Sequence, residues 1–151
     1  MQQRPGYQRK EFVARLNALV QFAWQQAIIT HQVHRVMFNA TDRTAFVERN
    51  ATKSAAAKLT FEPVKDSLAK ISWGSGIVIR EFIIEGFDEM KRRAGRGAET
   101  IWFYIVSDGM TQQVTINGLD KEDMVDGRGR PFGLVLNPFM AQFREYDTFQ
   151  K

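Results

Sequence analysis

The sequence contains no cysteine and only two histidines, and this scarcity excludes several kinds of chemistry. Without cysteine the chain has no disulfide bond, no thiol nucleophile and no thiolate metal ligand. The absence does not identify a compartment, because an exported protein can also do without disulfides. His31 and His34 stand three residues apart at the predicted end of a helix. We interpret both as polar residues of that junction, and we expect no metal site and no cofactor.

The sequence also lacks long apolar runs and the common nucleophile motifs. No run approaches the roughly 20 apolar residues that cross a bilayer, and no signal peptide is visible, so the chain as written is expected to be soluble. No G-x-S-x-G motif occurs, and Ser75, within Trp73–Gly76, is interpreted as part of a turn or of a close-packed glycine site. These absences predict a protein that is not an enzyme.

The composition is that of a globular domain. The 151 residues suffice for one domain with a buried core, and 44% of them are hydrophobic and 25% charged. The 21 basic and 17 acidic residues give a net charge of +4, which is too small to indicate a nucleic-acid-binding protein by itself.

Residues 8–30 are predicted to form one amphipathic helix. Apolar side chains recur there at steps of three and four residues, which places them on one face. At about 1.5 Å per residue the helix is roughly 34 Å long. Its apolar face is our candidate for packing or for binding a partner: Phe12, Leu16, Leu19, Ala23 and Ala27.

The rest of the chain, residues 33–146, is predicted to be mainly β. A hairpin is expected from 33–38 and 44–49, and a second from 100–106 and 112–116 around Asp108-Gly109, since Asp-Gly is a strong hairpin signal. Further strands are expected at 58–61, 77–79, 81–84 and 132–136, and Asn137-Pro138 is expected to turn the chain into 139–146. The prediction is a single α+β domain over residues 1–151, with the helix packed on antiparallel sheet.

Two charged segments could carry binding sites. The stretch 117–127 contains four carboxylates, but its spacing does not match a regular calcium loop, and we interpret it as a solvated surface loop. Two basic turns are candidates for nucleic-acid contact, with Trp102, Phe103 and Tyr104 nearby to stack on bases. At least one of these aromatic residues must point into the core, because they are consecutive in a strand. The candidate contacts are Lys91, Arg92, Arg93, Arg96, Arg128 and Arg130.

The order of three segments resembles that of a known family. The helical stretch 16–28 leads almost directly into the strand 33–38, the aromatic strand from Trp102 ends at Ser107-Asp108-Gly109, and the strand Phe132–Leu136 is followed by Asn137-Pro138. This arrangement resembles the GspH/FimT family of type II secretion minor pseudopilins and type IV minor pilins. The resemblance runs from about Glu11 to Tyr146 and is weakest between Asn50 and Gly97.

The resemblance implies a pilin-like fold and a structural role. Such a subunit would act near the tip of the pseudopilus in the export of folded proteins, with other major and minor pseudopilins and secreted proteins as partners. Family members begin with an apolar half-helix that anchors them in the bacterial inner membrane, facing the periplasm. That segment is absent from the sequence given, so we interpret residues 1–7 as a replacement start ahead of the second half-helix.

Two alternatives stay open at this point. A type IV minor pilin would prime pilus assembly or capture DNA during uptake, and the two basic turns would favour DNA capture. A free-standing single-stranded nucleic-acid-binding protein would require the chain to be complete as given.

Overall fold

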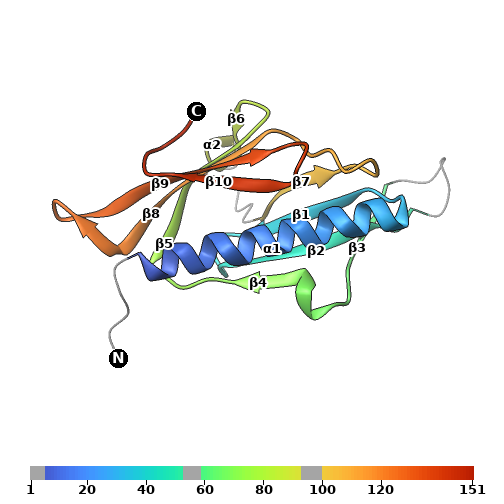
Figure 1. Cartoon of the computed structure of the whole chain (residues 1–151), viewed down its shortest axis with the longest axis horizontal. Helices are drawn as coiled ribbons and strands as arrows, with labels where there is room; N and C mark the ends of the chain where they lie inside the picture. The colour runs from blue at the N-terminus through green and yellow to red at the C-terminus, as the bar shows by residue number, and fades with distance from the viewer. Residues whose placement is uncertain (1–5, 53–58, 93–99) are drawn as a thin grey trace.

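The computed structural model describes residues 6–52, 59–92 and 100–151, and it consists of one long helix against two antiparallel sheets (Figure 1). Helix α1 (Tyr7–Thr30) runs along the long axis of the molecule. The first sheet, sheet A, has the strand order β3-β2-β1-β7, and β4 also pairs with β2. Its strands are β1 (His34–Asn39), β2 (Thr44–Asn50), β3 (Phe61–Pro63), β4 (Lys70–Ser72) and β7 (Thr100–Ile105).

The second sheet, sheet B, has the strand order β10-β9-β8-β5-β6. Its strands are β5 (Ile77–Ile84), β6 (Phe87–Asp88), β8 (Val114–Val125), β9 (Arg128–Asn137) and β10 (Gln142–Tyr146). A 3-10 turn, η1 (Ser67–Ala69), precedes β4, and a short helix, α2 (Glu89–Arg92), follows β6. This architecture confirms the predicted α+β class with one N-terminal helix on antiparallel sheets.

Helix α1 begins and ends at residues with left-handed backbone angles. Gly6, with φ of 83°, precedes its first turn, and His31, with φ of 54°, follows its last one. The left-handed residue at the C-terminal end stops the helix and redirects the chain, so that β1 begins at His34. This explains the short connection that the sequence predicted between helix and strand.

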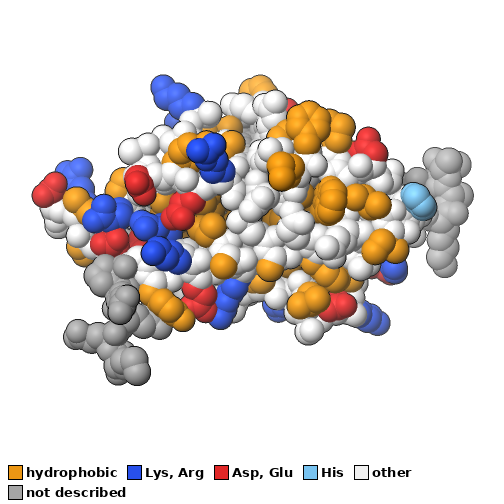
Figure 2. Space-filling model, viewed as in Figure 1, with side chains coloured by type: hydrophobic (Ala, Val, Ile, Leu, Met, Phe, Trp, Pro, Cys, Tyr) orange, Lys and Arg blue, Asp and Glu red, His pale blue; other side chains and the backbone are white. Residues whose placement is uncertain are grey.

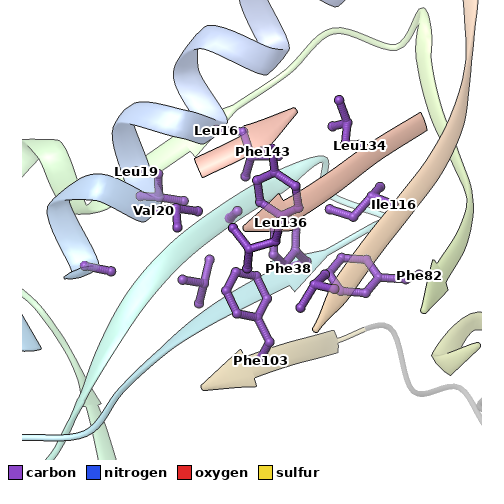
Figure 3. Close-up of a cluster of buried hydrophobic side chains, with 14 of the residues drawn as sticks. Leu16, Leu19, Val20, Phe38, Phe82, Phe103, Ile116, Leu134, Leu136 and Phe143 are labelled. Carbon is purple, nitrogen blue, oxygen red and sulfur yellow. The ribbon is translucent and has the colours of Figure 1, made fainter. Parts of the chain in front are cut away.

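The core lies where the apolar face of α1 meets both sheets (Figure 3). Aromatic pairs join the layers there. Phe38 of β1 lies 4.8 Å from Phe82 of β5 between ring centroids, and Phe103 of β7 lies 6.3 Å from Phe143 of β10. Each pair connects sheet A to sheet B, so the two sheets share one core with the helix.

Polar side chains of α1 bond to the free edge of β10. Asn17 donates from Nδ2 to the carbonyl of Phe143 at 3.2 Å and accepts at Oδ1 from its N–H at 2.7 Å. Gln21 donates to the carbonyls of Met140 and Ala141 at 2.7 and 2.9 Å. The bonds to Phe143 occupy backbone groups that an edge strand leaves unpaired, so the helix both covers the core and protects part of this edge of sheet B.

The hairpin predicted around Asp108-Gly109 is wrong. The strands on either side of it belong to different sheets, β7 to sheet A and β8 to sheet B. The two segments pair only next to the turn, through the bridge of Ile105 with Thr111 and the hydrogen bond from the N–H of Val106 to the carbonyl of Met110 at 2.9 Å. A Cβ atom on Gly109 would lie 2.6 Å from Nε1 of Trp24. Glycine is therefore needed there for close packing against α1, where the chain crosses between the sheets.

The loop predicted at 117–127 is also wrong, because most of it continues strand β8. The chain reverses at Asp126-Gly127 and returns as β9. Both turn residues have positive φ, 52° and 75°, as a type I′ hairpin turn requires. The Asp-Gly hairpin signal was thus real, but it belongs to this second Asp-Gly pair.

Two smaller differences concern strand boundaries. The segments predicted at 77–79 and 81–84 form the single strand β5, whose register with β8 shifts between Ile79 and Glu81. The strand predicted at 58–61 is placed at Phe61–Pro63, and Lys58 lies outside the described residues. The hairpin of β1 and β2 and the turn before β10 are confirmed.

Replacing Leu16 with alanine tests the packing of α1. Leu16 is fully buried, so Leu16→Ala should lower the free energy of unfolding by about 3 kcal/mol through lost burial and the remaining cavity. Leu68, which is 64% exposed, provides the control, and Leu68→Ala should change the free energy by less than about 0.5 kcal/mol. Urea unfolding followed by tryptophan fluorescence measures both. Equal effects of the two substitutions would contradict the described core.

Candidate interaction surface

The five helix residues predicted for packing or partner binding lie inside the protein. Each has at most 1% of its surface exposed, and with Val20 they are the buried residues of α1. They contact the protein's own sheets: Phe12, Leu16, Leu19, Ala23 and Ala27. A partner cannot reach these side chains in the folded protein, so any contact with α1 must use its opposite face.

The opposite face of α1 carries charged residues in its first half and none in its second half. The charged residues of α1 are Arg9, Lys10, Glu11 and Arg15, and no charged residue occurs from Leu16 to Thr30. The exposed residues of this second half are Ala18, Gln25, Ile28 and Ile29. Figure 2 shows the same division, with charged side chains gathered at the end where α1 begins and hydrophobic ones over the opposite half.

A groove of about 540 Å³ runs beside the uncharged half of the helix. Its lining combines helix residues with the turn between β9 and β10, and it contains no charged side chain: Asn17, Ala18, Gln21, Trp24, Phe139, Met140 and Gln142. Phe139 and Met140 are 69% and 58% exposed, although large apolar side chains usually avoid water. Aromatic residues and methionine are enriched, and charged residues depleted, at the centres of protein interfaces.

Hydrogen bonds hold the groove in shape. The side chain of Asn137 accepts from the N–H groups of Phe139 and Met140 at 2.9 and 3.2 Å, which fixes the turn. The side chain of Gln21 donates a hydrogen bond to the carbonyl of Met140 and so connects the turn to the helix. The two exposed apolar side chains are therefore presented on a defined backbone, which lowers the entropic cost of binding a partner.

We name the surface made of this groove together with Gln25, Ile28 and Ile29 the uncharged surface. The sequence did not predict Phe139 and Met140 as members of this surface. They are far from α1 along the chain, so no local pattern indicates that they lie beside the helix. One signal was available in the sequence: the absence of charge from Leu16 to Thr30 in a helix that has to expose one side.

The described residues among those proposed for nucleic-acid contact lie on two separate elements, α2 and the β8–β9 hairpin. Arg130 pairs with Asp123 at 2.7 Å on the β8–β9 hairpin, whereas Arg92 lies 3.4 Å from Glu89 on α2. Lys91 on α2 and Arg128 on the hairpin are exposed, and Arg93 and Arg96 lie outside the described residues. These contacts neutralise part of the charge that a phosphate backbone would need.

The aromatic strand contributes to both sides of sheet A. Phe103 is fully buried in the core, as the prediction that one of the three aromatics points inward requires. Trp102 and Tyr104 lie on the other side, where Trp102 donates from Nε1 to the hydroxyl of Tyr104 at 3.2 Å. The guanidinium of Arg35 stacks there between Phe61 and Trp102, 4.2 and 5.2 Å from the ring centroids, and pairs with Glu48 at 2.6 Å. These rings thus already contact side chains of the protein itself.

The described residues that the sequence offered for a metal site or for catalysis do not lie in one cluster. Of the four carboxylates in 117–127, Asp120 is fully buried and Asp123 is paired with Arg130. Within the described ranges no group of three or more potential metal ligands occurs. Ser75 lies in a turn, and a Cβ atom on the neighbouring Gly76 would lie 2.6 Å from Oε1 of Gln8.

The two histidines differ in environment. His31 is exposed at the end of α1, whereas His34 is fully buried, with Nδ1 2.9 Å from the carbonyl of Gln32. Burial lowers the pKa of His34 from its ordinary value of 6.5, with a further lowering from the positive charge of Arg49, while the hydrogen bond to Gln32 acts in the opposite direction.

The fold of the chain is shared with minor pseudopilins and a minor pilin of known structure. The chain is 12% identical to the minor pseudopilin EpsH of the type 2 secretion system of Vibrio cholerae, with a TM-score of 0.57 over 91% of this chain and 95% of that one. It is 15% identical to GspH of E. coli, with a TM-score of 0.61 over 93% and 89%. It is 13% identical to the type IV minor pilin FimU of Pseudomonas aeruginosa, with a TM-score of 0.51 over 91% of each chain.

These likenesses confirm the predicted resemblance at the level of the fold. No protein-family model matches the chain, and no curated protein sequence matches it either. Within the described residues, no helix is both long enough and apolar enough to cross a membrane.

Replacing His34 tests its buried environment through pH. Because the pKa in the folded state is lowered, the unfolded state binds more protons below about pH 6.5, and stability should fall as pH drops through this range. His34→Asn keeps an amide donor for the Gln32 carbonyl but cannot titrate, so it should reduce the loss of stability between pH 7 and pH 5.

His31→Asn is the matched comparison, since it removes a histidine from an exposed position whose left-handed backbone asparagine tolerates. Urea unfolding at several pH values gives the slopes. A His34→Asn slope equal to that of the unaltered chain would refute the assignment.

Proposed function

We propose that this chain is a structural subunit of a pilus-like filament, most specifically a minor pseudopilin of a type II secretion system. The observation that carries the proposal is the uncharged surface, which lies on a fold shared with minor pseudopilins and a minor pilin. An exposed face without charge, beside two exposed large apolar residues, is expected where a subunit packs against its neighbours.

The specific role is supported by two proteins of similar fold, one named as a minor pseudopilin and one as GspH. In this role the chain joins the pseudopilus near its tip and takes part in the export of folded proteins. Its partners are the other pseudopilins and the secreted proteins, its site of action is the bacterial inner membrane and periplasm, and it performs no catalysis.

A type IV minor pilin is the second candidate, because FimU has the same fold. The single-stranded nucleic-acid-binding alternative receives less support. Two of its proposed contacts already have acidic partners: Arg92 lies near Glu89 on α2, and Arg130 pairs with Asp123 on the β8–β9 hairpin.

Placing a negative charge on the uncharged surface tests the proposal. Ala18 is exposed and lines the groove, so Ala18→Glu leaves the fold intact but buries an unpaired carboxylate at the contact with a neighbour. In cells that carry the gene, we expect the variant to reduce export of folded proteins, or assembly of pili, by about tenfold or more, since each 1.4 kcal/mol lost from the contact lowers its affinity tenfold.

Ala14→Glu provides the matched control, because Ala14 is also exposed, one turn earlier, among the charged residues of the helix. It should retain nearly full activity. Loss of export with normal pili supports the pseudopilus, and loss of pili supports the minor pilin. Normal export and normal pili in the Ala18→Glu strain would contradict both.

A further inference from the structure

Two exposed methionines lie beside the uncharged half of α1, although they are far apart in the sequence. Met140 is 58% exposed and lines the groove, and Met110 is 42% exposed in the connection between β7 and β8. The N–H of Thr111 donates to the carbonyl of Pro138 at 3.0 Å, which joins this connection to the turn that carries Met140. The two thioether side chains therefore belong to neighbouring segments.

The helix holds both segments in place. Gly109 packs so closely against Trp24, which also lines the groove, that a Cβ atom on it would lie 2.6 Å from Nε1 of that ring. The side chain of Gln21 donates to the carbonyl of Met140 at 2.7 Å, and the side chain of Asn137 accepts from its N–H at 3.2 Å. Because the backbone is fixed in this way, a chemical change in either methionine stays beside the uncharged surface.

Methionine is the only sulfur-containing residue type of the chain, because cysteine is absent. The described methionines differ in exposure. Met37 is 8% exposed and Met90 packs against the core, whereas Met124 is 55% exposed on the β8–β9 hairpin. An oxidant in solution can therefore reach Met110, Met124 and Met140. Met124 lies at the opposite end of β9 from the turn that carries Met140, and so away from the uncharged surface.

A peroxide oxidises a thioether to a sulfoxide. The sulfur atom takes up one oxygen of the peroxide, the O–O bond breaks, and with hydrogen peroxide the other oxygen leaves as water. Sulfur loses two electrons and the peroxide gains them. The product is polar, and methionine sulfoxide reductases convert it back to the thioether. A sulfoxide that is buried in a protein contact without a hydrogen-bond donor costs free energy, because it loses its bonds to water.

We propose that Met110 and Met140 form an oxidation site that controls the uncharged surface. In the free subunit both side chains are open to peroxides. Oxidation places a polar oxygen where a neighbouring subunit has to pack, so the oxidised subunit is excluded from the assembly until a reductase restores the thioether. The exclusion from the assembly rests on the proposed function, whereas the oxidation of these two residues does not.

Peptide mapping by mass spectrometry tests the oxidation in the isolated chain. With hydrogen peroxide as the probe, Met110 and Met140 should be oxidised at least about tenfold faster than Met37, because the peroxide reaches Met37 only after local opening of the fold. The chain oxidised at these two residues should unfold at the same urea concentration as the unmodified chain, since both side chains are exposed. Equal rates for Met37 and Met140, or a large loss of stability, would overturn the proposal.

Leucine at both positions tests the consequence for assembly. Met110→Leu combined with Met140→Leu keeps the apolar volume and removes the oxidisable sulfur. The experiment uses cells that carry the gene, treated briefly with hydrogen peroxide. With the unaltered chain, export of folded proteins or assembly of pili should fall about tenfold, the effect expected from one polar group buried without a partner. With the double variant, most of the untreated level should remain.

Met124→Leu is the matched control, because it removes an equally exposed sulfur from the hairpin and should leave the sensitivity to peroxide unchanged. Protection by Met124→Leu, or a double variant as sensitive as the unaltered chain, would overturn the proposal. If Ala18→Glu blocks assembly while the double variant stays sensitive, only the oxidation site fails. If Ala18→Glu has no effect, the exclusion from the assembly fails with the proposed function, and peptide mapping alone decides the oxidation of Met110 and Met140.

Discussion

Helix α1 has to pack on two sheets at once, and the rest of the molecule is arranged around that contact. Its buried side meets β1 of sheet A and β10 of sheet B, and aromatic pairs such as Phe38 with Phe82 join the sheets beneath it. Asn17 and Gln21 fix the helix along the edge of β10 by bonding to its backbone and to the preceding turn. Because the apolar stripe is used within the protein, the proposed assembly would have to use the opposite side of the helix.

The elements that could be predicted from the sequence are those with a strong local pattern. The predictions of helix α1, from the spacing of its apolar residues, and of the short β1–β2 hairpin are confirmed, because residues close together in the sequence determine both. The two Asp-Gly pairs carry the same local signal, yet only Asp126-Gly127 forms a hairpin. Gly109 lies instead beneath Trp24, and this contact with a distant helix has no local signature. For the same reason Phe139 and Met140 were missed as members of the uncharged surface.

The distribution of charge separates two ends of the subunit. Near the start of α1, Arg9 pairs with Glu145 at 2.8 Å, and Arg130 pairs with Asp123 on the adjacent hairpin. The second half of the helix carries no charge and lies beside the groove. A binder of nucleic acid would be expected to gather unpaired cations on one face, whereas a subunit that packs sideways in a filament needs a face without the cost of desolvating charge. The described residues fit the second pattern.

The most direct test is whether the uncharged surface becomes inaccessible upon assembly. Since the chain contains no cysteine, single cysteines can be introduced without background: Gln25→Cys on the exposed side of α1, and Phe87→Cys, at a residue that is 69% exposed in sheet B, as the comparison. The measurement is the rate of reaction with a water-soluble maleimide, in the purified chain and in assemblies isolated from cells. The account predicts that Gln25→Cys reacts readily in the free chain and is protected in the assembly, while Phe87→Cys reacts similarly in both. Equal reactivity of Gln25→Cys in the free chain and in the assembly would contradict the account.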